Sequence, residues 1–218
     1  MKIGILFDLD GTLLNSLDDL TDAVNYTMRH YGCPERTMEE VREFIGNGAK
    51  QLIRLSLPGK ESDPPVDEAL AFYQRYYADH SQIKTRAYDG IPAALAQLQA
   101  RYPLAIVSNK PDIAVRSLCA DYFPGIYARG ESDDCLRKPA PDMVLKAMSE
   151  IGVDKCIYVG DSDVDVVTAQ NAGMPCLSVL WGFRDRTCME SVGGKHFCDD
   201  PAQMPRILTE IAEEYYGK

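Results

Sequence analysis

The chain has 218 residues, 45% of them hydrophobic, which is enough for one large domain or for a domain that carries an insertion. Its formal net charge of -10 argues against nucleic acid or an anionic membrane as a partner, so an anionic substrate would need local cations. No apolar run approaches the roughly 18 residues of a membrane span, and no signal-peptide cleavage site follows Met1.

The positions of the cysteines and histidines argue against a Cys-x-x-Cys motif and against a histidine metal site. The seven cysteines are dispersed without Cys-x-x-Cys spacing, a pattern typical of reduced structural thiols. The three histidines, His30, His80 and His196, are too far apart in the sequence to indicate a histidine metal site. We therefore expect a cytoplasmic protein, and the sequence leaves open whether it is a monomer or a homodimer.

The first predicted element is a buried strand over Ile3–Phe7, followed at once by Asp8-Leu9-Asp10-Gly11-Thr12. In open α/β sheets, ligands bind beyond the carboxyl ends of strands, and Gly11 permits a sharp turn with close backbone approach. Paired carboxylates suit a hard divalent cation, and one of them could act as a nucleophile. A solvated turn rich in Asp and Gly is the alternative.

A calcium loop would also use Asp-x-Asp, but it requires Gly at its sixth position and Glu at its twelfth. Counted from Asp8, those positions hold Leu13 and Asp19. The spacing therefore disfavours a calcium loop.

The next stretch lacks a convincing buried strand and has helical spacing throughout. It contains four predicted helices: Leu17–Tyr31, Met38–Phe44, Ala49–Leu57 and Val66–His80. We expect residues 17–85 to form an inserted helical domain, and residues 1–16 and 86–218 to form the core. Hinges near Asn15-Ser16 and Arg86–Gly90 would let such an insert close as a cap and exclude water. The alternative is that these helices simply pack on the core.

The rest of the chain alternates strands and helices, which predicts an α/β fold with a mostly parallel sheet. The predicted strands are Leu104–Val107, Ile126–Ala128, Cys156–Val159 and Cys176–Leu180. The predicted helices are Pro111–Cys119, Asp142–Ile151, Val164–Ala172 and Met204–Tyr215, with Gly173 as a C-terminal cap.

Two later strands also end in polar residues. Ser108-Asn109-Lys110 follows one, and Gly160-Asp161-Ser162-Asp163-Val164-Asp165 follows the other and opens a helix. Asp161 and Asp165 are four positions apart and would share one helical face in a regular turn. Between these clusters, Pro139 and Pro141 stiffen the segment that carries Lys138.

Taken singly, each of these residues has an ordinary reading: a strand-end turn, a solvated lysine, a helix cap at Asp161, an exposed acid at Asp163. Together, Asp8, Asp10, Asp161 and Asp165 would repel one another unless a cation sat among them, and Mg²⁺ suits such oxygen ligands. Ser108, Thr12 and Lys138 would then form a pocket for an anion such as phosphate. Mg²⁺ and a lysine make attack of a carboxylate on a phosphate feasible.

These segments resemble the four motifs of the haloacid dehalogenase-like superfamily. Asp8–Thr12 is similar to the first motif, Ser108 to the second, Lys138-Pro139 with Pro141 to the third, and Gly160-Asp161-Ser162 with Asp165 to the fourth. The resemblance spans nearly the whole chain. It implies a Rossmann-like core whose first strand is central, with an inserted α-helical cap domain.

The resemblance also implies a role for each matching residue. Asp8 would be the nucleophile that forms an aspartyl-phosphate, and Asp10 the acid and base, with its backbone carbonyl on Mg²⁺. Asp161 would be a direct metal ligand, and Asp165 a direct or an indirect one. The phosphate would be bound by Thr12, Ser108, Asn109 and Lys138. Dehalogenases of the superfamily lack the second aspartate, so Asp10 favours phosphoryl transfer.

Within the superfamily, softer signals resemble the phosphoglycolate phosphatase branch. They are residues 14–20, 45–49, 88–91 and Leu180-Trp181-Gly182-Phe183. The resemblance implies a small phosphorylated metabolite as substrate, with 2-phosphoglycolate as the first candidate. In the cap, Gly46 and Asn47 form a bend, and Lys50 and Arg54 could bind a substrate carboxylate; an exposed helix face is the alternative.

Other readings of the same motifs remain open. Pyrophosphatases, sugar-phosphate phosphatases and β-phosphoglucomutase share much of the pattern, and a non-catalytic binding protein could use the same fold. The sequence does not decide whether Trp181 to Arg184 contact substrate or only pack.

Overall fold

The computed structural model describes residues 1–217, which divide into two compact units. The sheet unit consists of Met1–Leu14 and the chain from Ala87 onward, and the helical unit is Asn15–Arg86. The chain passes between the units twice, in the short strands β2 (Leu14–Asn15) and β3 (Arg86–Ala87), which pair with each other.

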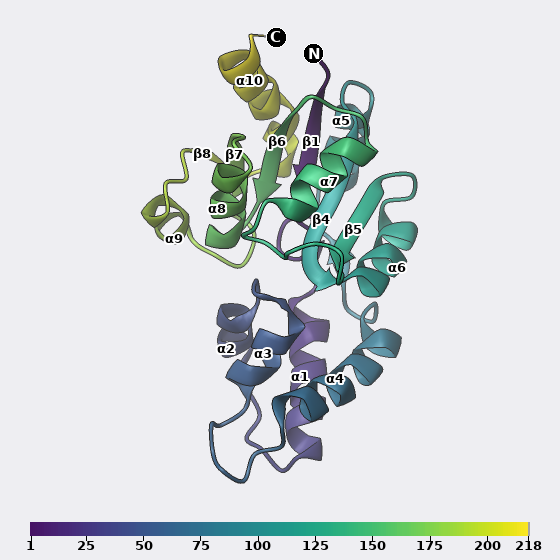
Figure 1. Ribbon diagram of the computed structural model, residues 1–218, viewed down its shortest axis with the longest axis vertical. Helices are drawn as coiled ribbons and strands as arrows, with labels where there is room; N and C mark the ends of the chain where they lie inside the picture. Colours follow the sequence, from purple (N-terminus) through teal and green to yellow (C-terminus); the bar gives the residue numbers. More distant parts are fainter. Residues whose placement is uncertain (218) are drawn as a thin grey trace. The chain divides into compact units, whose positions relative to one another are not determined.

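The sheet unit is built on six parallel strands in the order β5-β4-β1-β6-β7-β8 (Figure 1). Their bounds are β1 Ile3–Phe7, β4 Leu104–Pro111, β5 Tyr127–Glu131, β6 Lys155–Gly160, β7 Cys176–Val179 and β8 His196–Cys198. Strand β1 lies between β4 and β6, with Ile5 opposite Leu104 on one side and Ile157 on the other. The predicted α/β class, mostly parallel sheet and central first strand are therefore confirmed.

Both faces of this sheet are covered, so β1 is buried along its whole length. Ile5 and Phe7 point to one face, where they pack in a cluster with residues of α5, α6 and α10; Leu6 points to the other, against α7 and α8. The bounds of the covering helices are α5 Ile91–Gln99, α6 Asp112–Tyr122, α7 Asp142–Glu150, α8 Asp163–Asn171 and α10 Met204–Tyr216. The continuous apolar run of β1 thus follows from its position between two helical layers.

Strand β4 departs most from its prediction, because it extends past Val107 to Pro111. The polar residues Ser108, Asn109 and Lys110 are buried within it, and each has a hydrogen-bond partner inside the unit. Apolarity alone marked the end of the strand at Val107, so the prediction stopped too early. The register irregularity between Val107 and Pro111 opposite β5 coincides with this polar stretch.

Other predicted elements are shifted by a few residues, and several were missed, among them the two-residue strands β2 and β3. Strand β5 begins at Tyr127 and continues to Glu131, and α6 runs three residues beyond Cys119 to Tyr122. The sequence analysis did not identify α5, β8 or the short helix α9 (Arg186–Ser191). Gly173 follows α8 with φ +68°, as a C-terminal glycine does.

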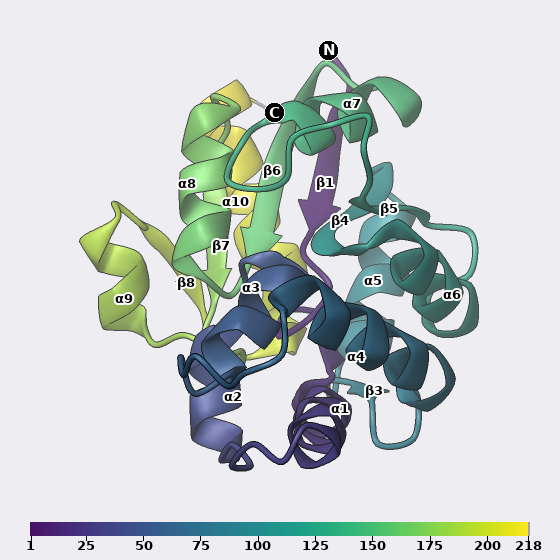
Figure 2. The ribbon, with the colours of Figure 1, turned by 60° about the horizontal axis from the view of Figure 1, so that its bottom comes forward.

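The helical unit contains α1 (Leu17–His30), α2 (Met38–Phe44), α3 (Gly48–Ser56) and α4 (Val66–His80), seen from below in Figure 2. Thr37 begins α2 with a reciprocal cap, because its hydroxyl accepts from Glu40 N and the Glu40 carboxylate accepts from Thr37 N. Near the start of α1, the buried Asp19 carboxylate accepts the backbone N–H groups of Lys84 and Thr85. This contact fastens the chain after α4 to α1.

None of the helices in residues 1–217 has the length and apolar character needed to cross a membrane.

The central position of β1 predicts where the sheet unit is sensitive to truncation. Ile5→Ala removes a side chain with 0% exposure and should lower the free energy of unfolding by about 2–5 kcal/mol. Ile113→Ala, at a side chain with 85% exposure on α6, should change it by less than about 0.5 kcal/mol. Urea denaturation followed by circular dichroism measures both, and equal losses would contradict this account of the core.

Candidate active site

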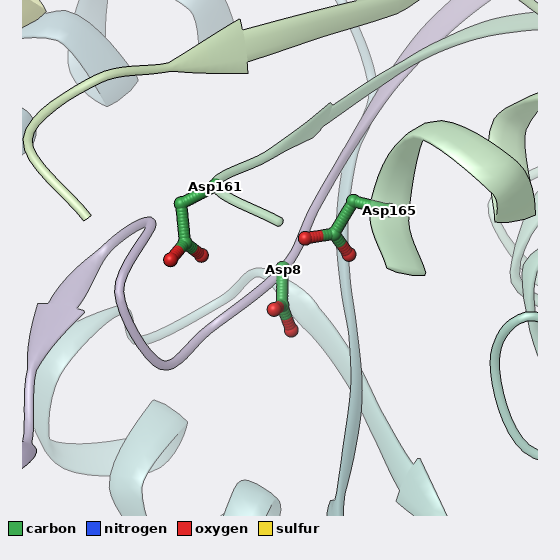
Figure 3. Close-up of side chains that lie close together, drawn as sticks. All are labelled: Asp8, Asp161 and Asp165. Carbon is green, nitrogen blue, oxygen red and sulfur yellow. The ribbon is translucent and has the colours of Figure 1, made fainter. Parts of the chain in front are cut away.

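Three aspartates meet at the carboxyl end of the sheet (Figure 3). Asp8 follows β1, Asp161 follows β6, and Asp165 lies in the first turn of α8. One oxygen of each carboxylate lies within 4.8 Å of the others. Asp8 is fixed in register by its backbone N–H, which donates to Val159 O on β6 at 2.8 Å. The parallel neighbours β1 and β6 therefore bring these side chains together, as their strand-end positions predicted.

Lys138 lies against this acidic group with a side chain only 2% exposed. Its Nζ is 2.9 Å from Asp8 Oδ1 and donates to Asp165 Oδ1 at 2.8 Å and to the Tyr158 hydroxyl at 3.1 Å. Tyr158 in turn donates to Val107 O, which holds the ring and its hydroxyl in place. The ammonium is therefore fixed between two carboxylates.

Asn109 holds the backbone of Lys138. Its side-chain Nδ2 donates to Lys138 O at 2.9 Å, and its Oδ1 accepts from Lys138 N at 2.8 Å. The resemblance implied that Asn109 contacts phosphate, whereas in the structure its amide positions Lys138. Asn109 therefore links the end of β4 to the segment that carries the lysine.

The charge of this group is unbalanced. Asp8, Asp161 and Asp165 with Lys138 sum to -2 when all four are ionised. Burial, with the Asp165 charge, raises the pKa of Asp161 well above its usual range. Burial also raises the pKa of Asp8 to about 7, against the lowering effect of Lys138. A divalent cation would cancel the excess negative charge.

One buried oxygen points to the same conclusion. Asp8 Oδ1 is buried and accepts no geometrically regular hydrogen bond, although Lys138 Nζ lies 2.9 Å from it. The Lys138 ammonium compensates the charge of this oxygen, which keeps acceptor capacity for a cation. The three oxygen donors, their spacing and this oxygen fit a hard divalent cation.

Asp165 and Asp161 have different partners. Ser162 is the N-terminal cap of α8, because its Oγ accepts from Asp165 N at 3.4 Å. In return, Asp165 Oδ2 accepts from Ser162 N at 3.1 Å and from Ser162 Oγ at 2.6 Å. Asp161 precedes that cap and is not part of the helix. The expectation of a shared helical face is therefore wrong, as is the alternative that Asp161 caps the helix, because the turn at Ser162 separates the two residues.

Asp161 is held by Thr12. The Thr12 hydroxyl donates to Asp161 Oδ1 at 2.9 Å, although the resemblance implied a phosphate contact for Thr12. The Ser108 hydroxyl, also expected at the phosphate, accepts from Lys110 N at 3.2 Å. Both residues are almost fully buried.

Asp10 forms a second ion pair beside the acidic group. Its two oxygens accept from Lys110 Nζ at 2.9 and 3.1 Å, and both side chains are largely buried. The Asp10 carboxylate is not one of the three that meet in the described part of the chain. Lys110 was visible in the sequence only as the third polar residue after a strand, and no role was predicted for it.

The residues expected to select the substrate lie in the helical unit. Gly46, at φ +116°, and Asn47 form the bend before α3. Lys50 Nζ is 2.6 Å from Asp67 Oδ1, and both side chains are well exposed. Arg54 is also exposed and donates to Gln51 Oε1 at 3.5 Å. Lys50 is thus an exposed lysine that already has an acidic partner.

The sequence profile of the haloacid dehalogenase-like hydrolases matches residues 5–179. A phosphoglycolate phosphatase of Pseudomonas aeruginosa is 35% identical over 190 residues, covering 82% of this chain and 70% of the relative. A plasmid-encoded phosphoglycolate phosphatase of Cupriavidus necator is 32% identical over 214 residues, covering 94% of this chain and 92% of the relative.

A solved structure has the same fold over nearly the whole chain. A crystal structure from Lactobacillus delbrueckii subsp. bulgaricus, of a protein provisionally named a phosphoglycolate phosphatase, superposes with a TM-score of 0.85. It is 35% identical, and the match covers 94% of this chain and 98% of that one.

The parallel sheet, the acidic group at its carboxyl end and these similarities define the class of protein: the chain belongs to the haloacid dehalogenase-like hydrolase family. Within that family it is a phosphoric monoester hydrolase, as are the relatives that it matches over most of its length.

The ion pairs of Lys138 predict a large effect on stability. Lys138→Met leaves two buried carboxylates uncompensated and should lower the free energy of unfolding of the metal-free protein by about 3–5 kcal/mol. Lys155→Met, at an exposed lysine on β6, is the matched control and should have little effect. Chemical denaturation at neutral pH compares the two; a small loss in Lys138→Met would show that its ion pairs do not stabilise the fold.

Proposed function

We propose that this protein is a Mg²⁺-dependent phosphatase that hydrolyses 2-phosphoglycolate through an aspartyl-phosphate on Asp8. The single observation that carries the proposal is the buried group of Asp8, Asp161 and Asp165 with Lys138 among them. The names of the relatives support the choice of substrate.

The acidic group would hold the metal. Asp8 and Asp161 would ligate Mg²⁺ with carboxylate oxygens, and Asp10 would ligate it with its backbone carbonyl. Asp165 would hold the Lys138 ammonium beside this site. Bound Mg²⁺ would neutralise negative charge on the phosphoryl oxygens.

The chain's own residues would carry out both steps of hydrolysis. An oxygen of Asp8 attacks phosphorus, the bond from phosphorus to the leaving oxygen breaks, and Asp10 gives that oxygen a proton. Asp10 then takes a proton from a water molecule, the water oxygen bonds to phosphorus, and the Asp8 carboxylate is released with inorganic phosphate. Asp10 ends each cycle with the proton with which it began.

The remaining strand-end residues would bind the phosphate or hold those that do. We assign direct contacts to Lys138, whose ammonium is 2.9 Å from Asp8, and to Ser108, on the strand β4 that pairs with β1. Thr12 and Asn109 would contribute by fixing Asp161 and Lys138, because their side chains already bond to these residues. The seven free cysteines are consistent with the cytoplasm as the site of the reaction.

We propose that the helical unit is a cap that excludes water from the reaction. Gly46, Asn47, Lys50 and Arg54 would face the substrate, and Lys50 would exchange Asp67 for the substrate carboxylate. An ammonium that gives up an exposed partner loses little, since such pairs contribute about 1 kcal/mol or less.

The direct test is phosphate release from purified protein with a panel of substrates, in Mg²⁺ and in chelator. The panel contains 2-phosphoglycolate, pyrophosphate, glucose 6-phosphate and β-glucose 1-phosphate. The proposal predicts a clear preference for 2-phosphoglycolate and loss of turnover in chelator. A preference for pyrophosphate or a sugar phosphate would reassign the substrate, and turnover that survives chelation would contradict the metal site.

Removal of the nucleophile gives the second prediction for this site. Asp8→Asn keeps the shape of the side chain but should lower kcat by about 10⁴-fold or more. Asp199→Asn, at an exposed aspartate of the sheet unit, should retain wild-type turnover. Turnover of 2-phosphoglycolate by Asp8→Asn at a rate near wild type would remove Asp8 as the nucleophile.

Replacing Lys110 should lower kcat/KM most for substrates whose leaving oxygen needs a proton, because Lys110 holds the Asp10 carboxylate with two hydrogen bonds. Lys110→Met should lower kcat/KM for 2-phosphoglycolate about 10- to 100-fold, and that for p-nitrophenyl phosphate much less, because nitrophenolate departs unprotonated. Lys110→Arg should restore part of the loss. Equal losses on both substrates would show that Lys110 does not act through the acid.

The proposed contact of Lys50 with the substrate carboxylate can be tested with two substrates. Lys50→Ala should lower kcat/KM for 2-phosphoglycolate more than for ethyl phosphate, which has no carboxylate. Lys60→Ala, at another exposed lysine of the same unit, is the control. An unchanged ratio between the two substrates in Lys50→Ala would exclude Lys50 from substrate selection.

A further inference from the structure

The segment after β7 reaches back to the acidic group at a residue that the resemblance did not connect with it. Phe183 N donates to Asp161 Oδ2 at 2.7 Å, and Trp181 Nε1 donates to Thr12 O at 3.0 Å. Trp181 and Thr12 are 169 positions apart in the chain. This segment is therefore bonded both to Asp161 and to the residue that holds Asp161 from the other side.

Each oxygen of Asp161 has one donor. Oδ1 accepts from the Thr12 hydroxyl and Oδ2 from Phe183 N. Since a carboxylate oxygen can accept two bonds, each oxygen keeps acceptor capacity for a cation. Asp161 is only 1% exposed, so bulk solvent screens its charge little.

Two glycines leave the space that Asp161 occupies. A Cβ built on Gly11 or on Gly182 would lie well inside van der Waals distance of the Asp161 side chain. Gly11 also has φ +84°, which favours glycine on its own, whereas Gly182 shows no such backbone requirement. At Gly182 the close approach to Asp161 is the feature that demands glycine.

The segment is itself anchored. Trp181 packs against the core cluster of the sheet unit, and Arg184 Nε is 3.8 Å from Asp163 Oδ1 in the first turn of α8. The donor at Phe183 is thus held from both sides, by an indole ring and by a guanidinium.

We infer that Thr12, Trp181, Gly182 and the Phe183 backbone form a clamp that fixes Asp161 in one conformation before the cation arrives, and so determine the affinity for Mg²⁺. They are positioning residues, because they act on the cation through Asp161. The physical reason is that a ligand held in place by its neighbours loses little conformational freedom on binding. The inference rests on the proposed function in one respect, that Asp161 ligates Mg²⁺.

Titration calorimetry of the metal-free protein with MgCl₂ tests the clamp without substrate or turnover. Thr12→Val should raise the Kd for Mg²⁺ about tenfold and Thr12→Ser should restore it, because serine keeps the hydroxyl. Gly182→Ala should raise the Kd at least as much, and Trp181→Phe should raise it measurably. Phe183→Ala keeps the backbone N–H and should bind Mg²⁺ like the wild type.

The increase in melting temperature on addition of Mg²⁺ gives a second readout, and it should shrink in the same order. Unchanged Kd values in Thr12→Val and Trp181→Phe, with an intact circular dichroism spectrum, would overturn the inference even if Gly182→Ala failed to fold. A wild-type protein that binds no Mg²⁺ would instead contradict the metal site of the proposed function, which separates the two failures.

Discussion

The buried ion pairs of Lys138 are the constraint on which the rest of the site depends. A lysine at 2% exposure loses its hydration, and the nearby carboxylates of Asp8 and Asp165 compensate its charge. Asn109 holds its backbone, and Tyr158 accepts a hydrogen bond from its ammonium. In the account proposed here, a divalent cation compensates the negative charge by which three carboxylates exceed this one ammonium.

The three aspartates of the group are chemically identical but differ in their partners. Asp165 bonds to Lys138 and to the cap at Ser162, so we assign it a supporting part. Asp161 is held from two sides with acceptor capacity to spare. Asp8 alone keeps a buried oxygen without a hydrogen bond. Environment, rather than residue type, separates the nucleophile, the metal ligand and the support in the account proposed here.

The sequence predicted the parts of the molecule that depend on local pattern. Strand β1, with its apolar run and the acidic turn after it, needed only periodicity and residue type. The meeting of Asp8 with Asp161 followed from the rule that parallel strands share a carboxyl edge. The four helices of the helical unit were predicted within one residue at each end, from helical spacing and from the absence of a buried strand.

What the sequence could not supply was the partner of each polar side chain. Thr12 and Asn109 were expected at the phosphate, but they bond to Asp161 and to the Lys138 backbone, contacts between distant segments that no local pattern encodes. Lys110 was placed in a strand-end turn with no role, because its ion pair is with Asp10, one hundred positions away. Strand β8 has only three residues, too few for a periodic signal.

The account stands most directly on whether Asp8 becomes phosphorylated during turnover. Enzyme mixed with excess 2-phosphoglycolate and Mg²⁺ would be quenched in acid within milliseconds, digested and mapped by mass spectrometry. The account predicts one phosphoryl group on the peptide that contains Asp8, formed at least as fast as phosphate is released. Phosphate release at full rate with no phosphorylated Asp8 at any time point, or with the group on another residue, would contradict it.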